Sequence, residues 1–335
     1  MNIAPVIKII RKALNRIRIQ SYWIRTKKLR VYLAKIKSNQ RSSFHVLRNK
    51  FPEIYSELKK YNVDEFTTLM WRNINTKLEK VFLPSPPFSF LKDWIVRDTM
   101  FCILSIKTVK RWLAFLEKKI PKSRLKIFLQ EEYIGEPLPL ISTYLTSSTR
   151  VQHLSHLVRF IDETGYDLNH INTVVEWGGG YGGMAALFRK LINKSFTYII
   201  IDIPIVSCIQ WLYLASILGE ENVSIFRSPE DVIHAGKVNL IPVCFIEQFV
   251  AQSDLNINKI NTDLFISTWA LSESSKYAQD YVVGHNWFGA KHILLAYQNS
   301  YKELPDADRI GRLAIGDGAT IYDMDWLPVN YYAFR

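Results

Sequence analysis

Five glycines fall within six consecutive positions: Gly178, Gly179, Gly180, Gly182 and Gly183. The residues before them, 173–177, read as a short buried strand, and residues 184–191 after them have the spacing of an amphipathic helix. A glycine turn between a strand and a helix lets backbone N–H groups approach a ligand, because no Cβ stands in the way, and the helix N-terminus attracts negative charge. We therefore predict that a ligand binds at this turn.

The same glycines match two cofactor patterns. Gly178, Gly180 and Gly183 fit the G-x-G-x-x-G of a dinucleotide site, in which a pyrophosphate rests on the helix N-terminus. Starting at Glu176, the sequence also reads E-x-G-x-G-x-G, which resembles the S-adenosylmethionine (SAM) turn of class I methyltransferases. A carboxylate at the end of the strand suits the ammonium of an amino-acid moiety and repels a pyrophosphate. Glu176 therefore favours SAM, and an NAD(P)-dependent oxidoreductase is the alternative.

A second acidic residue follows at the distance that both cofactors require. Residues 197–201 are a continuous apolar, β-branched run, typical of a strand buried on both faces, and Asp202 ends it. At the tip of the second parallel strand, a carboxylate accepts hydrogen bonds from both hydroxyls of a ribose. The predicted cofactor site contains Glu176, Gly178, Gly179, Gly180, Tyr181, Gly182, Asp202, Ile203 and Thr268.

The net charge of +12 is concentrated in one segment. Residues 1–50 contain 14 Lys or Arg and no Asp or Glu, which leaves 29 basic and 31 acidic residues in the rest of the chain. Apolar residues recur between these bases at helical spacing, at Ile3, Val6, Ile7, Ile10, Leu14 and Ile17. We interpret residues 1–43 as a basic amphipathic arm, of which residues 1–40 bring the protein to an anionic membrane surface without spanning it. A protein partner is the alternative, and we expect no nucleic acid partner because a reader motif is missing.

Composition narrows the remaining classes. The hydrophobic content of 48% supports a large core, and the sequence has no apolar run of transmembrane length. The three cysteines are far apart and lack C-x-x-C spacing, so we expect neither a disulfide framework nor a zinc site. His153 and His156 share a helix face, but a third ligand is missing, and we expect no metal site. We expect a cytoplasmic protein, peripheral on the cytoplasmic face of the membrane.

The order of the elements predicts two further regions. Residues 44–148 show helical stripes interrupted by the proline-rich run 83–87, and residues 149–335 alternate strands and helices as a doubly wound α/β sheet does. We expect strands at 173–177, 197–202, 223–226, 240–246, 263–268 and 292–297, and helices at 150–164, 182–193, 204–219, 229–235 and 275–283. Either 223–226 or 240–246 is the third parallel strand. Two last runs, 319–324 and 329–334, suit an antiparallel hairpin.

Three segments together resemble a known family. VVEWGGGYGG, IIIDIP and the run DLFISTWALSE at 263–273 are similar to the sugar O-methyltransferases found among polysaccharide-biosynthesis proteins, over roughly residues 133–300. The resemblance implies a Rossmann-like class I methyltransferase sheet, and the runs at 319–324 and 329–334 suit the C-terminal antiparallel hairpin of such a sheet. The helical stripes place a mostly α-helical region before it. It also implies SAM as cofactor and a sugar or glycan acceptor, nucleotide-linked or lipid-linked, in surface polysaccharide or glycan biosynthesis. A non-catalytic SAM-binding scaffold protein is a further alternative.

Methyl transfer to a hydroxyl requires an aligned acceptor and a group that takes its proton. In an open α/β sheet such a group lies at the carboxyl ends of the strands. His285, before the strand at 292–297, is the first candidate, because a histidine titrates near neutral pH. Glu273, after the strand at 263–268, is the second and needs burial to raise its pKa. His153, on a helix that could close the pocket, is the third.

Overall fold

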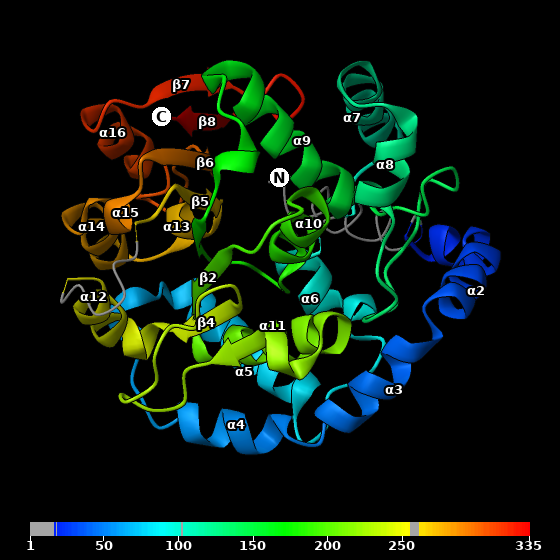
Figure 1. Cartoon of the computed structure of the whole chain (residues 1–335), viewed down its shortest axis with the longest axis horizontal. Coiled ribbons are helices and arrows are strands. Elements are labelled where there is room, and N and C mark those ends of the chain that lie inside the picture. Colours follow the sequence, from blue (N-terminus) through cyan, green and yellow to red (C-terminus); the bar gives the residue numbers. More distant parts are fainter. Residues whose placement is uncertain (1–16, 18, 102, 255–260) are drawn as a thin grey trace, which may run out of the picture.

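The computed structural model describes residues 17, 19–101, 103–254 and 261–335 (Figure 1). The predicted amphipathic helix from Ile3 to Ile17 therefore lies outside the described residues except for Ile17. The described chain is built around one eight-stranded sheet of order β3-β4-β2-β1-β5-β6-β8-β7. Its strands are β1 (Thr173–Trp177), β2 (Thr197–Asp202), β3 (Val223–Ile225), β4 (Val238–Pro242), β5 (Leu264–Thr268), β6 (His292–Gln298), β7 (Thr320–Asp323) and β8 (Asn330–Phe334).

The strand directions confirm the predicted sheet. Strands β1 to β6 run parallel, and β8 lies antiparallel between β6 and β7. The central strands are apolar because both of their faces are covered: Val175 of β1 pairs with Ile199 of β2 and Phe265 of β5, and all three are fully buried. The fold is that of class I methyltransferases. Both candidate runs for the third strand are strands, with β4 beside β2 and the short β3 outside it.

Two predictions near this edge of the sheet are wrong. Residues 229–235 form no helix, because the Asp231 carboxylate accepts the backbone N–H groups of Arg227 and Ser228 and so stabilises a turn. The strand expected at 240–246 begins at Val238 and ends at Pro242, since proline has no N–H to continue the ladder. The apolar residues after it belong to a 3-10 turn and to a helix that periodicity did not predict, α12 (Ile246–Asp254).

Helices cover both faces of the sheet. They are α9 (Ser148–Thr164), α10 (Gly183–Leu191), α11 (Pro204–Leu218), α13 (Ala270–Glu273), α14 (Lys276–Gly284), α15 (Asn286–Gly289) and α16 (Arg309–Gly316). The helix predicted at 150–164 is confirmed as α9, and Ser147 caps it, because the Ser147 side chain accepts the Arg150 backbone N–H at 3.1 Å. The cap fixes the residue at which α9 begins, and β1 is the next strand after this helix.

The N-terminal helices pack against the same body. They are α2 (Lys27–Ile36), α3 (Ser38–Leu47), α4 (Phe51–Leu58), α5 (Leu69–Phe82), α6 (Trp94–Thr99), α7 (Ile106–Lys119) and α8 (Lys122–Leu129). Helices α2 to α4 form the outer blue arc in Figure 1, and α3 and α4 contact α11. Helix α11 is therefore covered by the sheet on one side and by helices on the other, which explains why it is apolar on all sides.

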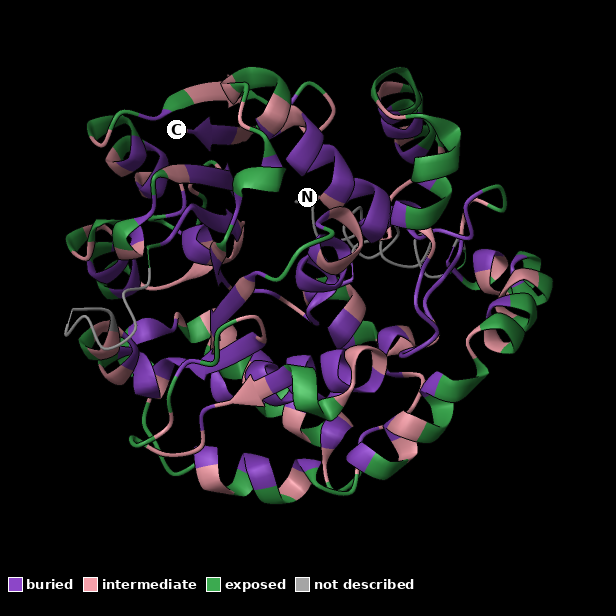
Figure 2. Ribbon diagram, viewed as in Figure 1, coloured by how far each residue is buried: buried purple, intermediate pink, exposed green. Residues whose placement is uncertain are grey.

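One core joins the two regions. Phe44 and Phe51 of the N-terminal helices are fully buried in the cluster that also contains Val175 and Ile199 of the sheet. Figure 2 shows buried residues both in the N-terminal helices and along the strands. The predicted boundary between residues 43 and 44 falls inside α3, which continues through it without interruption. None of the helices in the described part of the chain has the length and apolarity that a bilayer crossing requires.

Candidate active site

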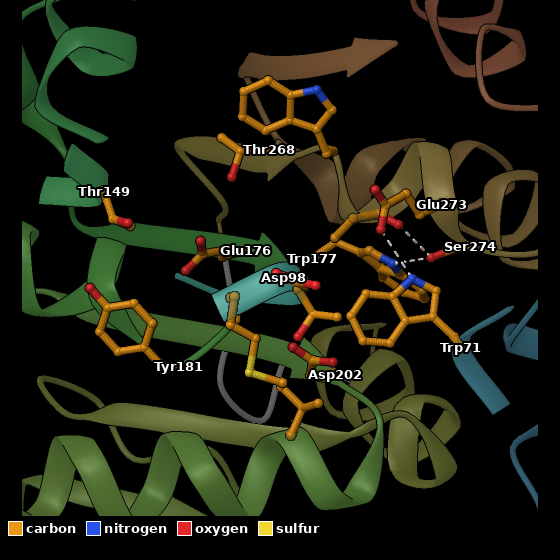
Figure 3. A pocket seen from close by; sticks show the side chains of 18 of the residues that line it. Trp71, Asp98, Thr149, Glu176, Trp177, Tyr181, Asp202, Thr268, Glu273 and Ser274 are labelled. Carbon is orange, nitrogen blue, oxygen red and sulfur yellow. Dashed lines mark hydrogen bonds between the residues drawn. The ribbon is translucent and has the colours of Figure 1, made fainter. Parts of the chain in front are cut away.

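A cavity of about 760 Å³ lies at the carboxyl ends of β1, β2 and β5 (Figure 3). Of the nine residues predicted to bind the cofactor, all except Gly182 line it. Figure 3 shows Thr149 and Tyr181 on one side and Trp71 and Glu273 on the other, with Glu176 and Asp202 between them. The structure therefore brings the glycine turn and both predicted acidic residues into one site.

The glycines of the turn differ in what they do. Gly178 has φ +75°, and a Cβ there would lie 1.9 Å from the Cβ of Ala270, so glycine is required for packing as well as for the turn. Gly182 does not line the cavity, and the prediction that it binds the cofactor finds no support. It is the N-cap of α10, and a Cβ on it would lie 2.9 Å from Leu214 of α11. Its role is close packing of two helices.

Glu176 is the penultimate residue of β1 and a buried carboxyl, with 2% of the residue exposed. The Tyr198 hydroxyl donates to its Oε2 at 2.8 Å. Burial, with a smaller contribution from the nearby charge of Asp202, raises the pKa of Glu176 to about 8. A cation that binds against this buried carboxyl would stabilise its charged form.

Asp202 ends β2 and is held on two sides. The Ile203 N–H donates to its Oδ1 at 2.8 Å, and Gln210 Nε2 donates to its Oδ2 at 2.7 Å. The same Gln210 nitrogen lies 3.0 Å from the Gly180 carbonyl oxygen, so one side chain ties the glycine turn to the tip of β2. Burial raises the pKa of Asp202 to about 7 against these hydrogen bonds. Sequence reasoning missed Gln210. The available signal was a glutamine within an otherwise apolar helix, and the structure shows that this glutamine is fully buried.

The opposite wall comes from the segment after β5 and from α5. Trp71 Nε1 donates to Glu273 Oε2 at 3.1 Å, and Gln298 Nε2 lies 3.5 Å from Glu273 Oε1. Burial raises the pKa of Glu273, and these hydrogen bonds limit the rise. Trp269 has φ +66°, an uncommon conformation for a bulky residue, and its indole N–H donates to Asn330 Oδ1 at 2.7 Å.

Several lining residues come from helices far away in the sequence. They are Ile19, Trp71, Arg97, Asp98, Met100, Thr149 and Gln152. No motif marks them, because their spacing serves helix packing and only the folded chain brings them to the sheet edge. The N-terminal region therefore supplies part of the site through Ile19, Trp71, Arg97, Asp98 and Met100, which lie outside the resemblance over residues 133–300.

The three candidate bases lie in different places. His153 lines the cavity, and burial with the neighbouring Arg150 charge lowers its pKa to about 3, so it is neutral. Glu273 lines it too. His285 does not: it caps the end of α14, with its Nδ1 2.8 Å from the Tyr281 carbonyl and its ring centroid 4.1 Å from that of Tyr281. The preference for His285 is therefore corrected, because the chain turns it away from the strand ends.

His156, the predicted neighbour of His153, is fully buried and takes no part in the cavity. Its Nδ1 lies 2.7 Å from the Tyr332 hydroxyl of β8, and it packs against Trp269. Within the described ranges, no group of three or more His, Cys, Asp or Glu side chains is placed to hold a metal ion.

Comparisons with known proteins give distant matches only. No family model matches the chain, and no curated protein does. Among solved structures, it is similar to the pyocyanin biosynthetic protein PhzM, with 12% identity over 56% of each chain and a TM-score of 0.33. It is also similar to the CurJ carbon methyltransferase, with 10% identity over 94% of this chain and 97% of that one and a TM-score of 0.37.

A third similar structure is an O-methyltransferase family protein from Burkholderia thailandensis, with 12% identity over 91% of this chain and 96% of that one and a TM-score of 0.32. This chain matches only about half of PhzM's length. Similarities this distant say nothing about cofactor or substrate. The fold class follows from the strand order and the terminal hairpin.

Proposed function

We propose that the protein is a SAM-dependent O-methyltransferase that transfers a methyl group to a sugar hydroxyl in surface polysaccharide or glycan biosynthesis. The observation that carries the proposal is the pair of strand-end carboxyls, Glu176 and Asp202, on either side of the glycine turn in one cavity. Glu176 would accept the ammonium of SAM, and Asp202 would accept the ribose hydroxyls. A dinucleotide would instead place its pyrophosphate near a buried carboxyl, which costs electrostatic energy.

The lining of the cavity supports an uncharged, hydroxyl-rich acceptor. Its indole side chains, Trp71, Trp177 and Trp269, offer apolar area, while carboxyl and amide groups of Asp98, Glu273, Gln298 and Asn330 can bond to hydroxyls. Among the described lining residues, four carry carboxyl groups and Arg97 alone is an arginine or lysine. The lining therefore offers an anionic group on the reacting sugar little positive charge. The sequence resemblance over residues 133–300 points to the same acceptor class.

The chain's own residues fit an in-line displacement. When bound, SAM supplies a methyl group on a positively charged sulfur. In such a transfer the acceptor oxygen would form a bond to that carbon while the carbon–sulfur bond breaks, with its electron pair left on sulfur. Glu273 lines the cavity on the side opposite Thr149 and Tyr181 (Figure 3), and its carboxylate would take the hydroxyl proton. Its buried position makes it a stronger base than an exposed glutamate.

Thermal shift separates the two cofactors. SAM should raise the melting temperature by several degrees, since a ligand at 100 times its Kd stabilises the folded state by about 2.7 kcal/mol, and NAD should leave it unchanged. Differential scanning fluorimetry with either compound measures this. A shift with NAD and none with SAM would overturn the proposal in favour of an oxidoreductase. A SAM shift without methyl transfer to any sugar or glycan would instead favour a scaffold protein.

SAM affinity should rise with pH from about pH 6 to about 7.5. The pKa of Glu176 is about 8 and that of Asp202 about 7, so both carboxyls hold protons at acid pH and must lose them to bind an ammonium and a ribose. Each carboxyl that is still protonated costs up to about tenfold in affinity per pH unit. Above about pH 7.7 the amino group of SAM loses its own proton and offsets the gain.

Isothermal titration calorimetry in buffers of different ionisation enthalpy checks this, because proton release then appears in the binding heat. Glu176→Gln should bind SAM more weakly near neutral pH and show a shallower pH dependence. A flat pH profile of the unchanged protein would contradict a role for these two carboxyls.

A further inference from the structure

The outer face of residues 17–36 carries exposed apolar side chains in a helical segment. Residues 19–25 are helical, and α2 follows after Thr26. The exposed side chains, with the exposed fraction of each residue, are Ile17 (66%), Ile24 (70%), Val31 (64%), Tyr32 (54%) and Ile36 (41%). Ile17, Ile24 and Val31 are seven residues apart, close to two helical turns, and so share one face. Nothing in the described protein covers this face, which we call the outer face.

Basic side chains stand on and beside the outer face. Lys28 and Lys35 follow Ile24 and Val31 by four positions, and Arg25 and Lys27 are exposed beside them. Within the described residues none of these four has an ion pair with an acidic side chain. The sequence adds no Asp or Glu before Glu53. The outer face is therefore apolar and positively charged together.

The inner face of the same segment is anchored to the body. Leu33 is fully buried, and Tyr22 is 8% exposed within the core. Gln40, just beyond α2, donates to the Glu132 carboxylate at 2.5 Å and accepts the Tyr133 N–H at 2.7 Å. Ile19 belongs to this inner face and lines the cavity itself. The outer face thus has a fixed position relative to the candidate active site.

We propose that the outer face docks on the surface of an anionic lipid bilayer, lying in the plane of the headgroups. Apolar side chains interleaved with Lys and Arg are what an interfacial helix needs, because insertion and headgroup attraction then act together. A nucleic acid would bind the Lys and Arg side chains, but it would give no reason for the exposed apolar side chains of Ile24 and Val31. This consequence rests on the proposed function: because Ile19 of the same segment lines the cavity, docking would hold the cavity close to the membrane and so beside acceptors that are carried by lipids.

Flotation of the full chain with vesicles tests this. The protein should float with vesicles of phosphatidylcholine and phosphatidylserine at low salt, detach as salt shortens the screening length, and bind pure phosphatidylcholine poorly. Ile24→Asp with Val31→Asp should abolish flotation. Val46→Asp is the matched control, since Val46 on α3 is 66% exposed and lies outside the outer face. Lys28→Gln and Lys35→Gln should each weaken vesicle binding about fivefold.

Point substitutions serve better than removal of the segment, because Leu33 is fully buried and Tyr22 belongs to the core. Three results would overturn the proposal: flotation of the double aspartate variant like the unchanged protein, an equal loss for Val46→Asp, or equal binding to neutral vesicles. If the lysine variants weaken binding while the aspartate variant does not, charge alone acts and another polyanion becomes the partner. The SAM thermal shift of every variant is measured in parallel, so loss of docking is distinguished from loss of cofactor binding.

Discussion

Replacing Asp202 with alanine should lower SAM affinity about 100-fold or more while the protein stays folded. The carboxylate would accept both ribose hydroxyls, and a hydrogen bond to a charged group contributes about 1.5–3 kcal/mol. Asp202 is well placed for this, because Ile203 N–H and Gln210 Nε2 fix its two oxygens at 2.8 and 2.7 Å. Asp202→Asn, which keeps the shape and one acceptor oxygen, should lose less.

Calorimetric titration of SAM into folded variants measures the effect. Asp263→Asn is a matched control, because Asp263 is also a buried acid of the sheet, 5% exposed, but precedes β5 at the amino end, away from the cavity. Its substitution should lower the melting temperature, because the charged Asp263 carboxylate accepts the Asn172 and Thr173 N–H groups and an amide accepts them less strongly. SAM affinity should not change. Unchanged affinity in Asp202→Ala would exclude the proposed ribose site.

The sheet was predictable because its signals are local. A buried parallel strand needs a short run of branched apolar residues, and the runs that became β1, β2 and β5 end at the residues expected. The turn after β1 was predictable for the same reason, since its glycines mark a backbone that other residues strain. The hairpin of β7 and β8 followed from two apolar runs joined by a short turn, and its pairing beside β6 was the expected closure of the sheet.

The errors arose where the tertiary environment decides. The loop at 229–235 follows a side-chain hydrogen bond of Asp231, which competes with helix formation in a way that periodicity cannot show. His285 stands near the amino end of β6 in the sequence, and only the end of α14 shows which way its ring points. Gly182 looked like part of a ligand turn and is needed for helix packing.

The wall of the cavity formed by Trp71 and Glu273 is the part of the site that the sequence predicted least. Trp71 and Glu273 are 202 residues apart in the sequence, yet their side chains are hydrogen-bonded at 3.1 Å. Nothing in a single sequence links them, because α5 presents Trp71 only after the N-terminal helices have packed on the sheet. That packing also buries Glu273 and so raises its pKa, which makes a carboxylate next to the glycine-turn site a usable base.

Glu273→Gln should therefore lower turnover by two to four orders of magnitude, which is the usual range for loss of a general base, while SAM affinity changes little. The amide keeps the size of the side chain and its acceptor for Trp71 but takes up no proton. In the unchanged enzyme, kcat should rise with pH, because the base must be unprotonated. Burial raises the pKa of Glu273, so kcat should rise at a higher pH than the ordinary pKa of a glutamate would give.

Formation of S-adenosylhomocysteine at saturating SAM, with nucleotide-linked and lipid-linked sugars as acceptors, measures turnover. Trp71→Phe removes one hydrogen bond that favours the charged form of Glu273, so it should move the rising limb to higher pH without removing the activity. His285→Ala should leave both rate and profile unchanged, because that ring packs on Tyr281 outside the cavity. If His285→Ala loses turnover and Glu273→Gln does not, the base is His285. If neither does, the neutral His153 on the cavity wall becomes the group to replace next, since its Nδ1 lacks a hydrogen-bond partner among the described residues.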